Sequence, residues 1–296
     1  MSEQLSRWSS WMLAIRPRTL PAAAAGVIMG SALAWRDGFF RIDAALACLF
    51  TALLLQMGSN LANDVFDFER GTDTPERLGP VRVTQAGLLT PLQVKQGMAV
   101  VFALAALFGL YLVWLGGWPI ILIGIAAILS AIAYTGGPFP LGYYGLGDLF
   151  VFIFFGLASV SGTYYVQAGF VSTAAWWMTT PPGLIITAIL VVNNLRDLES
   201  DRKAGKHTLA VILGEQATKT QYLICMMAAY LVLPLAAWMG IVWWSSLLAW
   251  LSLPLAIRST HVVFTKKGRP LNAALAGTGQ TALVFSILFW LGLSFK

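Results

Sequence analysis

Two stretches of the chain combine carboxamides and carboxylates at helical spacing. In the first, residues 60–73, the polar positions are Asn60, Asn63, Asp64 and Asp67. In the second, residues 193–201, they are Asn194, Asp197 and Asp201. Because these positions fall three, four and seven residues apart, each set occupies one face of a helix. Carboxylates at the edge of a membrane helix are costly unless paired, solvated or bound to cations. The two sets therefore predict one site between two helices.

Spaced carboxylates at a water-exposed helix end are suitable ligands for a hard cation. Mg²⁺ is usually held by a few carboxylates together with substrate phosphates. The predicted catalytic and metal-binding carboxylates are Asp64, Asp67, Asp197 and Asp201, with Asn63 as a further ligand. Basic residues beside them predict contacts to phosphate oxygens, and these are Arg82, Arg196, Arg202 and Lys206. Acids and bases around a cation are typical of a diphosphate site. The alternative is a solvated loop with incidental charges.

Composition places these stretches in a membrane protein. The 296 residues are 58% hydrophobic and 11% charged, whereas a soluble domain carries roughly a quarter charged residues. The long apolar runs do not alternate in the manner of β-barrel strands. Cys48 and Cys225 lie apart inside apolar runs, so neither a zinc site nor a disulfide framework is predicted. We expect an all-α polytopic membrane protein with one domain, residues 1–296, and no nucleic-acid partner.

Runs of about 20 apolar residues predict a bundle of about nine transmembrane helices with cytoplasmic capping loops. The expected spans are 19–35, 43–64, 93–115, 117–134, 147–168, 174–195, 219–239, 241–258 and 272–293. Gly116-Gly117 separates the third and fourth spans, and Gly136-Gly137-Pro138 ends the fourth. Pro181-Pro182 falls inside the sixth span, where a kink can be tolerated if neighbouring groups satisfy the freed carbonyls. Apolar spans do not distinguish lipid-facing from partner-facing surfaces, so the oligomeric state stays open.

The distribution of basic residues predicts the orientation. One side of the membrane carries most of them, including Arg7, Arg16, Arg70, Arg77, Arg196, Lys203, Arg258 and Lys266, whereas only Arg36, Arg41 and Lys296 fall on the other. By the positive-inside rule the N-terminus is cytoplasmic and the C-terminus lies outside. Both acidic stretches and the Gly/Pro-rich segment 134–148 then face the cytoplasm. No cleavable signal pattern precedes the first span, and a bacterial plasma (inner) membrane fits best.

The pattern Asn63-Asp64-x-x-Asp67 and Asp197-x-x-x-Asp201 resembles the two aspartate-rich motifs of the UbiA superfamily of intramembrane prenyltransferases. The resemblance covers nearly the whole chain. It implies Mg²⁺-dependent transfer of a prenyl group from a polyprenyl diphosphate to an aromatic acceptor, with the tail held in the apolar bundle. One position departs from the superfamily pattern: Gly71 stands where a third aspartate is usual. Asp73, two residues later, is the remaining candidate metal ligand.

Five further blocks resemble the branch of this superfamily whose acceptor is 1,4-dihydroxy-2-naphthoate, in menaquinone biosynthesis. They are residues 16–21, 60–64, 77–82, 143–148 and 193–197. The implied product is demethylmenaquinol, formed with loss of CO₂ and diphosphate. Two alternatives stay open: a sibling enzyme with another acceptor, such as 4-hydroxybenzoate, heme or chlorophyllide, and a cation-coupled transporter. A transporter predicts a charged or broken-helix site near the bilayer midplane, whereas these acids lie at helix ends.

The remaining candidate residues contact the substrates in this interpretation. Asn60 and Asn194 belong to the acidic stretches, and Gln85 would line a capping loop. Arg16 would either pair with the acceptor carboxylate or, like Arg18, only set the orientation and snorkel to the interface. Asp148 is either a helix N-cap or a substrate contact. Tyr134, Tyr143 and Tyr164 would shield a prenyl cation or act as packing aromatics. Loops 69–90 and 197–217 are predicted to close over the substrate. His207 and His261 are interpreted as loop residues.

Overall fold

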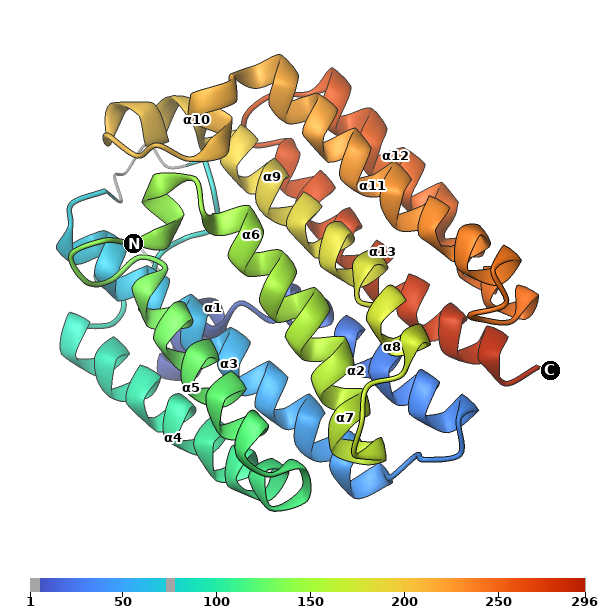
Figure 1. Ribbon diagram of the computed structural model, residues 1–296. Helices are drawn as coiled ribbons and strands as arrows, with labels where there is room; N and C mark the ends of the chain where they lie inside the picture. The colour runs from blue at the N-terminus through green and yellow to red at the C-terminus, as the bar shows by residue number, and fades with distance from the viewer. Residues whose placement is uncertain (1–5, 73–77, 296) are drawn as a thin grey trace.

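A computed structural model describes residues 6–72 and 78–295 of the chain. These residues form a bundle of α-helices and contain no strand (Figure 1). Seven helical runs in the described residues are long and apolar enough to cross a membrane. The prediction of an all-α polytopic membrane protein is therefore confirmed.

Each of the nine expected spans coincides with a helix or with consecutive helices. The first five spans correspond to α2 (Leu20–Arg36), α3 (Ile42–Glu69), α4 (Pro91–Gly116), α5 (Trp118–Ala133) and the run α6 (Gly147–Val151), η3 (Phe152–Ser161) and α7 (Gly162–Ala168). The others correspond to α8 (Thr173–Trp177) with α9 (Thr180–Lys203), α11 (Glu215–Trp238), η4 (Trp244–Ser252) with α12 (Leu253–Thr265), and α13 (Leu271–Leu293). Short elements connect them: α1 (Arg7–Ile15), η1 (Pro17–Thr19), η2 (Leu141–Tyr144) and α10 (Leu209–Leu213).

Local sequence signals set several helix ends. Thr90 and Gln93 form a capping box at the start of α4, with Pro91 in the first turn, where a missing N–H costs nothing. Gly117 adopts φ +72° between α4 and α5, a conformation open to glycine but strained for other residues. The expected break at Gly116-Gly117 is thus confirmed.

The sixth span is interrupted just before Pro181-Pro182: α8 ends at Trp177, and α9 then starts with both prolines in its first turn, where they remove no helical hydrogen bond. Two local expectations are wrong. The eighth span continues to Thr265, so His261 lies in a helix rather than in a loop. The N-cap of α6 is Leu146, and Asp148 is already a helical residue.

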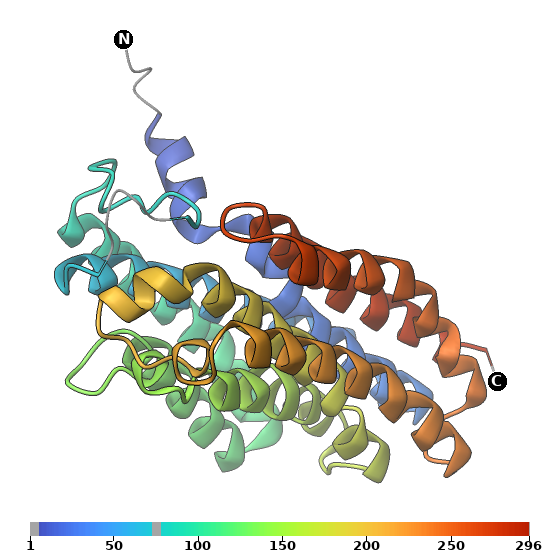
Figure 2. The same cartoon turned by 90° about the horizontal axis from the view of Figure 1, so that it is seen from above.

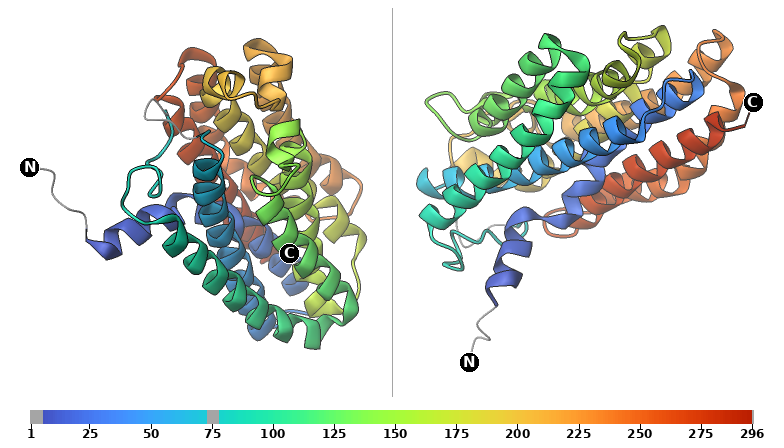
Figure 3. Two further views of the ribbon diagram at one scale, coloured as in Figure 1. Left: turned by 90° about the vertical axis from the view of Figure 1, so that its left-hand side faces the viewer. Right: turned by 90° about the horizontal axis from the view of Figure 1, so that it is seen from below.

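The two acidic stretches end at the same end of the bundle, which we call the polar end. It is the end at which α3 and α9 finish, next to α10, at the upper left of Figure 1. Helix α1 projects from the bundle on this side, as the view from above shows (Figure 2). The two further views show the same projection beside the ends of α3 and α4 (Figure 3).

Glycines allow close packing of the helices that surround the interior. A Cβ added to Gly156 of η3 would stand 2.7 Å from the carbonyl oxygen of Thr179 and 2.9 Å from the Cα of Gly183. A Cβ on Gly26 of α2 would stand 2.7 Å from the carbonyl oxygen of Phe155. Helices α2 and α9 therefore approach the η3 helix nearly backbone to backbone, as small residues permit in membrane proteins.

Candidate active site

A cavity of about 860 Å³ lies inside the bundle, among α2, α3, α4, α5, the α6–η3–α7 run, α9 and α13. At the polar end its lining is charged and includes Asp67, Arg82, Asp197, Asp201 and Lys206. Farther along α3 the lining becomes apolar and extends to Cys48. The helical rise between Cys48 and Asp67 corresponds to about 28 Å, so the cavity follows most of the span.

Asp67, near the end of α3, contacts a guanidinium, a phenol and an ammonium group at the polar end. Its Oδ2 accepts a hydrogen bond from Arg82 Nη2 at 2.9 Å. Its Oδ1 accepts from the Tyr143 hydroxyl at 2.8 Å and from Lys206 Nζ at 3.3 Å. Asp67 and Arg82 are both at most 5% exposed. A buried carboxylate of this kind keeps its charge only with such partners.

Asp197, in α9, is paired with its chain neighbour. Arg196 donates from Nε to Asp197 Oδ1 at 2.8 Å and from Nη2 to Asp197 Oδ2. The guanidinium also donates to Asn193 Oδ1 at 2.8 Å and to Asn272 Oδ1 at 2.7 Å. The Arg196 side chain is fully buried. Two carboxamides thus fix a buried cation against the carboxylate.

Lys206 lies between the two acidic stretches. Its Nζ is 3.3 Å from Asp67 Oδ1 and 3.8 Å from Asp201 Oδ1. The same ammonium lies 4.4 Å from the centroid of the Tyr143 ring, in cation–π contact. Lys206 therefore connects the end of α3 with the end of α9.

Asp64 has a different environment from Asp67. It is completely buried and is not among the residues that line the cavity. Its two oxygens accept the backbone N–H groups of Val83 at 3.1 Å and Thr84 at 3.0 Å, and Arg16 Nη2 is 3.8 Å away. Asp64 thereby fixes to α3 the segment that carries Arg82.

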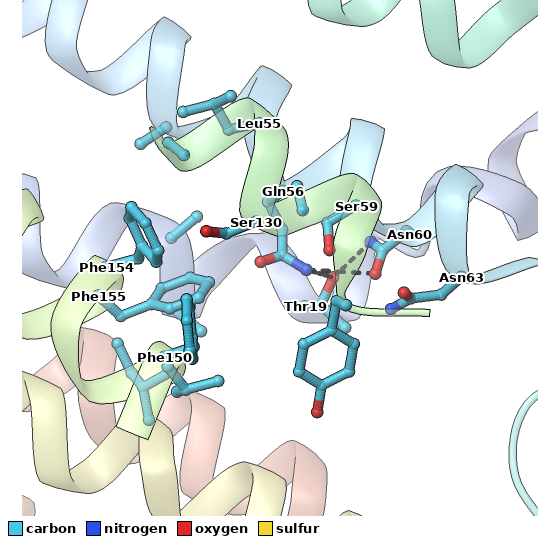
Figure 4. A pocket seen from close by; sticks show the side chains of 18 of the residues that line it. Thr19, Leu55, Gln56, Ser59, Asn60, Asn63, Ser130, Phe150, Phe154 and Phe155 are labelled. Atoms are coloured by element: carbon cyan, nitrogen blue, oxygen red, sulfur yellow. Dashed lines mark hydrogen bonds between the residues drawn. The ribbon is translucent and has the colours of Figure 1, made fainter. Parts of the chain in front are cut away.

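Asn60 fixes the N-terminal segment in the same way. Its Nδ2 donates to the carbonyl oxygen of Ile15 and to Thr19 Oγ1, both at 2.9 Å. Gln56 Nε2 donates to Asn60 Oδ1 at 3.2 Å, and Figure 4 shows the hydrogen bonds among Thr19, Gln56 and Asn60. Together with the bond to Ile15, these contacts support Arg16, whose φ of +53° is the only positive value outside glycine in the described residues. Asn60 and Arg16 both line the cavity.

Three further predicted residues, Asn63, Tyr134 and Asn194, line the cavity, as does Tyr143. Asn63 Oδ1 accepts a hydrogen bond from Thr135 Oγ1 at 3.0 Å. Burial and the charge of Asp67 raise the pKa of the Tyr143 phenol. This phenol therefore stays protonated at neutral pH.

Several predicted residues lie away from the cavity lining. Gln85 and Arg202 are not part of it, and Arg202 instead pairs with Glu199 on an exposed helix face at 3.0 Å. Asp148 is not a helix cap. Its Oδ2 accepts from Gln221 Nε2 at 3.0 Å, and its buried Oδ1 has no hydrogen-bond partner.

Two candidate residues, Tyr164 and Asp73, are not among the described residues of the polar end. Tyr164 lies at the end of the bundle opposite the acidic stretches, fully buried, and its hydroxyl donates to Asp37 Oδ2 at 2.7 Å. It cannot shield a cation at the polar end, and its role is packing and hydrogen bonding. Asp73 lies outside the described residues.

Sequence reasoning missed several polar residues of the cavity lining, and three of them, Thr135, Asn193 and Asn272, bond to predicted site residues. Asn193 directly precedes Asn194, and only Asn194 was identified as a candidate. Thr135 lies in the Gly/Pro-rich segment that was assigned only as a group. Asn272 carried the clearest signal, because it is a lone carboxamide at the start of the last apolar span, on the same predicted face of the membrane as the acidic stretches.

The oxygen donors at the polar end fit a hard cation bound together with an anionic ligand. Among the described residues, no three histidine, cysteine or carboxylate side chains gather into a site that could hold a metal alone. Asp67, Asp197, Asp201 and Asn63 nevertheless line the same cavity. Mg²⁺ keeps few protein ligands and completes its shell with water and phosphate oxygens, so this incomplete set suits a cation–phosphate complex.

The apolar part of the cavity begins directly beside the polar network. Phe150, Phe154 and Phe155 stand on one side in Figure 4, and Gln56 and Ser59 project from α3 on the other. Toward Cys48 the lining consists mostly of aliphatic side chains from α4 and α5. The cavity therefore matches a long ligand with one charged end and an apolar remainder.

Comparisons with known proteins agree with this shape. The profile described as the UbiA prenyltransferase family matches residues 23–290. The 1,4-dihydroxy-2-naphthoate octaprenyltransferase of Escherichia coli K12 is 39% identical, over 98% of this chain and 97% of its own length. The enzyme of the same name from Mycobacterium tuberculosis H37Rv is 38% identical, over 96% of both chains.

A solved structure shares the fold at low sequence identity. The UbiA homolog from Archaeoglobus fulgidus bound to DMAPP and Mg²⁺ superposes with a TM-score of 0.68 and covers 97% of this chain and 100% of its own. Its sequence is 13% identical. The likeness extends over the complete set of spanning helices.

Proposed function

The chain belongs to the UbiA prenyltransferase family, and from this premise we propose that it transfers a polyprenyl group from a polyprenyl diphosphate to 1,4-dihydroxy-2-naphthoate. The reaction releases CO₂ and diphosphate and gives demethylmenaquinol. Relatives named 1,4-dihydroxy-2-naphthoate octaprenyltransferase, which are 31–39% identical over nearly the full length, support the naphthoate as the acceptor. The cavity that joins a charged end to an apolar length is the observation that carries the chemistry.

The carboxylates and bases at the polar end bind the diphosphate end of the donor. Asp67, Asp197 and Asp201, with Asn63, hold Mg²⁺, which supplies charge neutralisation on the departing diphosphate. Lys206 and Arg82 donate to the phosphate oxygens. Asp64 contributes by holding the segment 82–84 in place, and Asp73 stays a predicted further ligand.

Ionisation of the allylic C–O bond leaves positive charge on the prenyl carbon and negative charge on the diphosphate. Lys206 and the buried guanidinium groups are already fixed where the negative charge develops, so they need little reorganisation. The aromatic faces of Tyr134 and Tyr143 border the same end of the cavity and shield the cation. No covalent intermediate with the protein is required.

The acceptor enters beside the N-terminal segment. Arg16 pairs with its carboxylate, and Asn60 holds the segment that carries Arg16. The electron-rich ring attacks the prenyl carbon, a new C–C bond forms, and the carboxyl group leaves as CO₂. Hydrocarbon side chains such as Phe154 line the space for the tail.

We place the enzyme in a bacterial plasma membrane with its N-terminus and polar end on the cytoplasmic side. The concentration of basic residues in the loops at that end supports this orientation. In this orientation both water-soluble reactants, the naphthoate and Mg²⁺, approach from the cytoplasm. Loops 69–90 and 197–217, of which residues 73–77 lie outside the described residues, stay predicted to close over the bound donor.

A prenyl-transfer assay tests the proposal. Purified protein in detergent receives a radiolabelled prenyl diphosphate and either dihydroxynaphthoate or 4-hydroxybenzoate, with and without Mg²⁺. We expect product from the naphthoate alone, only with Mg²⁺, and losses above about 100-fold in Asp67→Asn and Asp197→Asn. Asp43→Asn, which changes a carboxylate at the opposite end of α3, is the matched control.

Each other outcome has a defined meaning. Product from hydroxybenzoate keeps the mechanism and overturns the acceptor. Product without Mg²⁺, or full activity in both variants, overturns the site. No product from either acceptor, with folded protein, overturns the proposed function and returns the transporter to consideration.

A further inference from the structure

The two halves of the polar end come from separate parts of the chain, and Asn272 contacts both. One half consists of Asp67 with Arg82, which stands on the loop after α3. The other consists of Asp197 with Arg196 on α9. Asn272 lies in the first turn of α13 and lines the cavity between them.

On one side Asn272 accepts a hydrogen bond. Its Oδ1 receives Arg196 Nη1 at 2.7 Å, while the rest of that guanidinium is bound to Asp197 and Asn193. The Arg196 side chain is fully buried. A cation held by three oxygen-bearing side chains has little freedom to follow a carboxylate that takes up a metal.

On the other side Asn272 donates a hydrogen bond. Its Nδ2 reaches the backbone carbonyl oxygen of Leu78 at 3.0 Å. Leu78 lies four residues before Arg82, whose Nη2 is bound to Asp67. Asp64 fixes the same loop through the amides of Val83 and Thr84. Asn272 and Asp64 therefore hold the loop on either side of Arg82.

We propose that Asn272 is a positioning residue that couples the loop carrying Arg82 to the arginine beside Asp197, so that both halves of the site respond together to a magnesium diphosphate group. The inference rests on the proposed function. A carboxamide suits this position because it donates and accepts at once. Leucine removes both bonds, and aspartate keeps the acceptor for Arg196 but loses the donor to Leu78.

Hydrogen exchange of the full-length protein in detergent tests the coupling without any need for turnover. Exchange is followed in peptides covering residues 78–90 and 193–208 while inorganic diphosphate is titrated at fixed Mg²⁺. The variants are Asn272→Leu and Asn272→Asp. The control is Thr281→Val, which removes another buried polar group of α13 whose hydroxyl bonds only to the carbonyl oxygen of Gly277. Steady-state KM and kcat for the prenyl diphosphate are measured in parallel.

In the wild type we expect diphosphate to slow exchange in both segments with one midpoint. Asn272→Leu shifts the midpoint about tenfold upward and removes the response of residues 78–90, with KM changing more than kcat. In Asn272→Asp the segment 193–208 still responds and the loop does not. Thr281→Val behaves as the wild type.

The contrary results are equally clear. The coupling is overturned if either Asn272 variant keeps the wild-type midpoint and still responds to diphosphate in both segments. If Thr281→Val loses the response to diphosphate equally, Asn272 contributes only to the general packing of α13, and the coupling is again overturned. If Asn272→Leu does not fold, Asn272→Asp decides, because it keeps the bond to the buried guanidinium. Diphosphate binding without prenyl transfer in the wild type overturns the proposed function and leaves the coupling intact.

Discussion

At the scale of single residues, the carboxylates of the polar end are already paired within the chain. Asp67 contacts Arg82 and Lys206, Asp197 contacts Arg196, and the charges are mutually compensated. A bare divalent cation must displace these partners. A cation that arrives with diphosphate exchanges partners instead, since the metal takes the carboxylates and the diphosphate takes the bases.

Arg82→Gln separates these two effects. We expect Mg²⁺ alone to bind several-fold more tightly, because Asp67 loses a compensating charge, while KM for the prenyl diphosphate rises about tenfold or more. Calorimetric titration with Mg²⁺ and steady-state kinetics measure the two changes. Lys267→Gln, which breaks a pair with Glu215 away from the cavity, is the control. If Mg²⁺ affinity and affinity for the prenyl diphosphate both rise or both fall in Arg82→Gln, the result would contradict this exchange of partners.

Tyr143 provides a test of the pH dependence. Burial and Asp67 raise its pKa, so the folded protein binds this proton more tightly than the unfolded chain. The resulting stabilisation is present below about pH 10 and is lost above it. Tyr143→Phe should lower the rate several-fold. Any fall in rate on the alkaline side of the rate–pH profile that occurs below that pH should keep the same midpoint in the variant. A midpoint that moves in the variant would assign that fall to Tyr143.

The residue types of the site were readable from the sequence, but their contacts were not. Helical spacing identified Asp67 and Asp197 as candidates, because the spacing of residues along one helix can be read directly from the sequence. It could not reveal that Asp64, three residues before Asp67, is turned toward backbone amides of a loop rather than toward the cavity. It also gave no reason to connect Asn272 with Arg196, since that contact depends on how α9 and α13 pack.

At the scale of helices, the η3 segment is held by close backbone contacts. Its hydrogen-bonding pattern is that of a π-helix over Phe152–Ser161, and such segments are rare and often occur at functional sites. Phe154 and Phe155 face the cavity from this segment. Hydropathy located the span, but no local signal in the sequence marked the change in helical winding.

Gly156→Ala should disturb this packing. The added methyl meets backbone atoms of Thr179 and Gly183, which cannot rotate away, so we expect a loss of about 1–3 kcal/mol in stability and lower activity. Thermal unfolding in detergent measures the loss. Gly124→Ala, with no atom within 4 Å of its added Cβ, should be neutral or slightly stabilising. Equal unfolding temperatures for the two variants would show that α9 and η3 are not in close contact.

At the scale of the whole molecule, the cavity sets a limit on the tail. Its end far from the charges is formed by residues of the apolar cluster that includes Val27, Cys48, Ile120 and Val166. The sequence predicted an apolar bundle and the membrane face of the acids. It could not predict the length of the open interior, because hydropathy does not distinguish a side chain that faces a cavity from one that faces lipid.

Cys48→Trp should shorten the accepted donor. A large ring at the apolar end removes space for the last isoprene units and leaves the charged end about 28 Å away unchanged. We expect long donors to lose at least tenfold in kcat/KM while a short donor reacts normally, as measured with a series of chain lengths. Leu46→Trp, on the exposed side of the same helix, is the control. Uniform loss for all donors would place the tail elsewhere.

The division of the cavity into a charged end and an apolar length also bears on turnover. The donor is an amphiphile, held at one depth of the bilayer by its diphosphate. In the proposed reaction, the quinol that replaces the donor carries neither a diphosphate nor a carboxylate, so the contacts proposed for Lys206 and Arg16 have no charged partner. Its hydrocarbon is solvated almost equally by the cavity and by lipid tails. The reaction thus turns a lipid anchored at one leaflet into a carrier free to cross between the two.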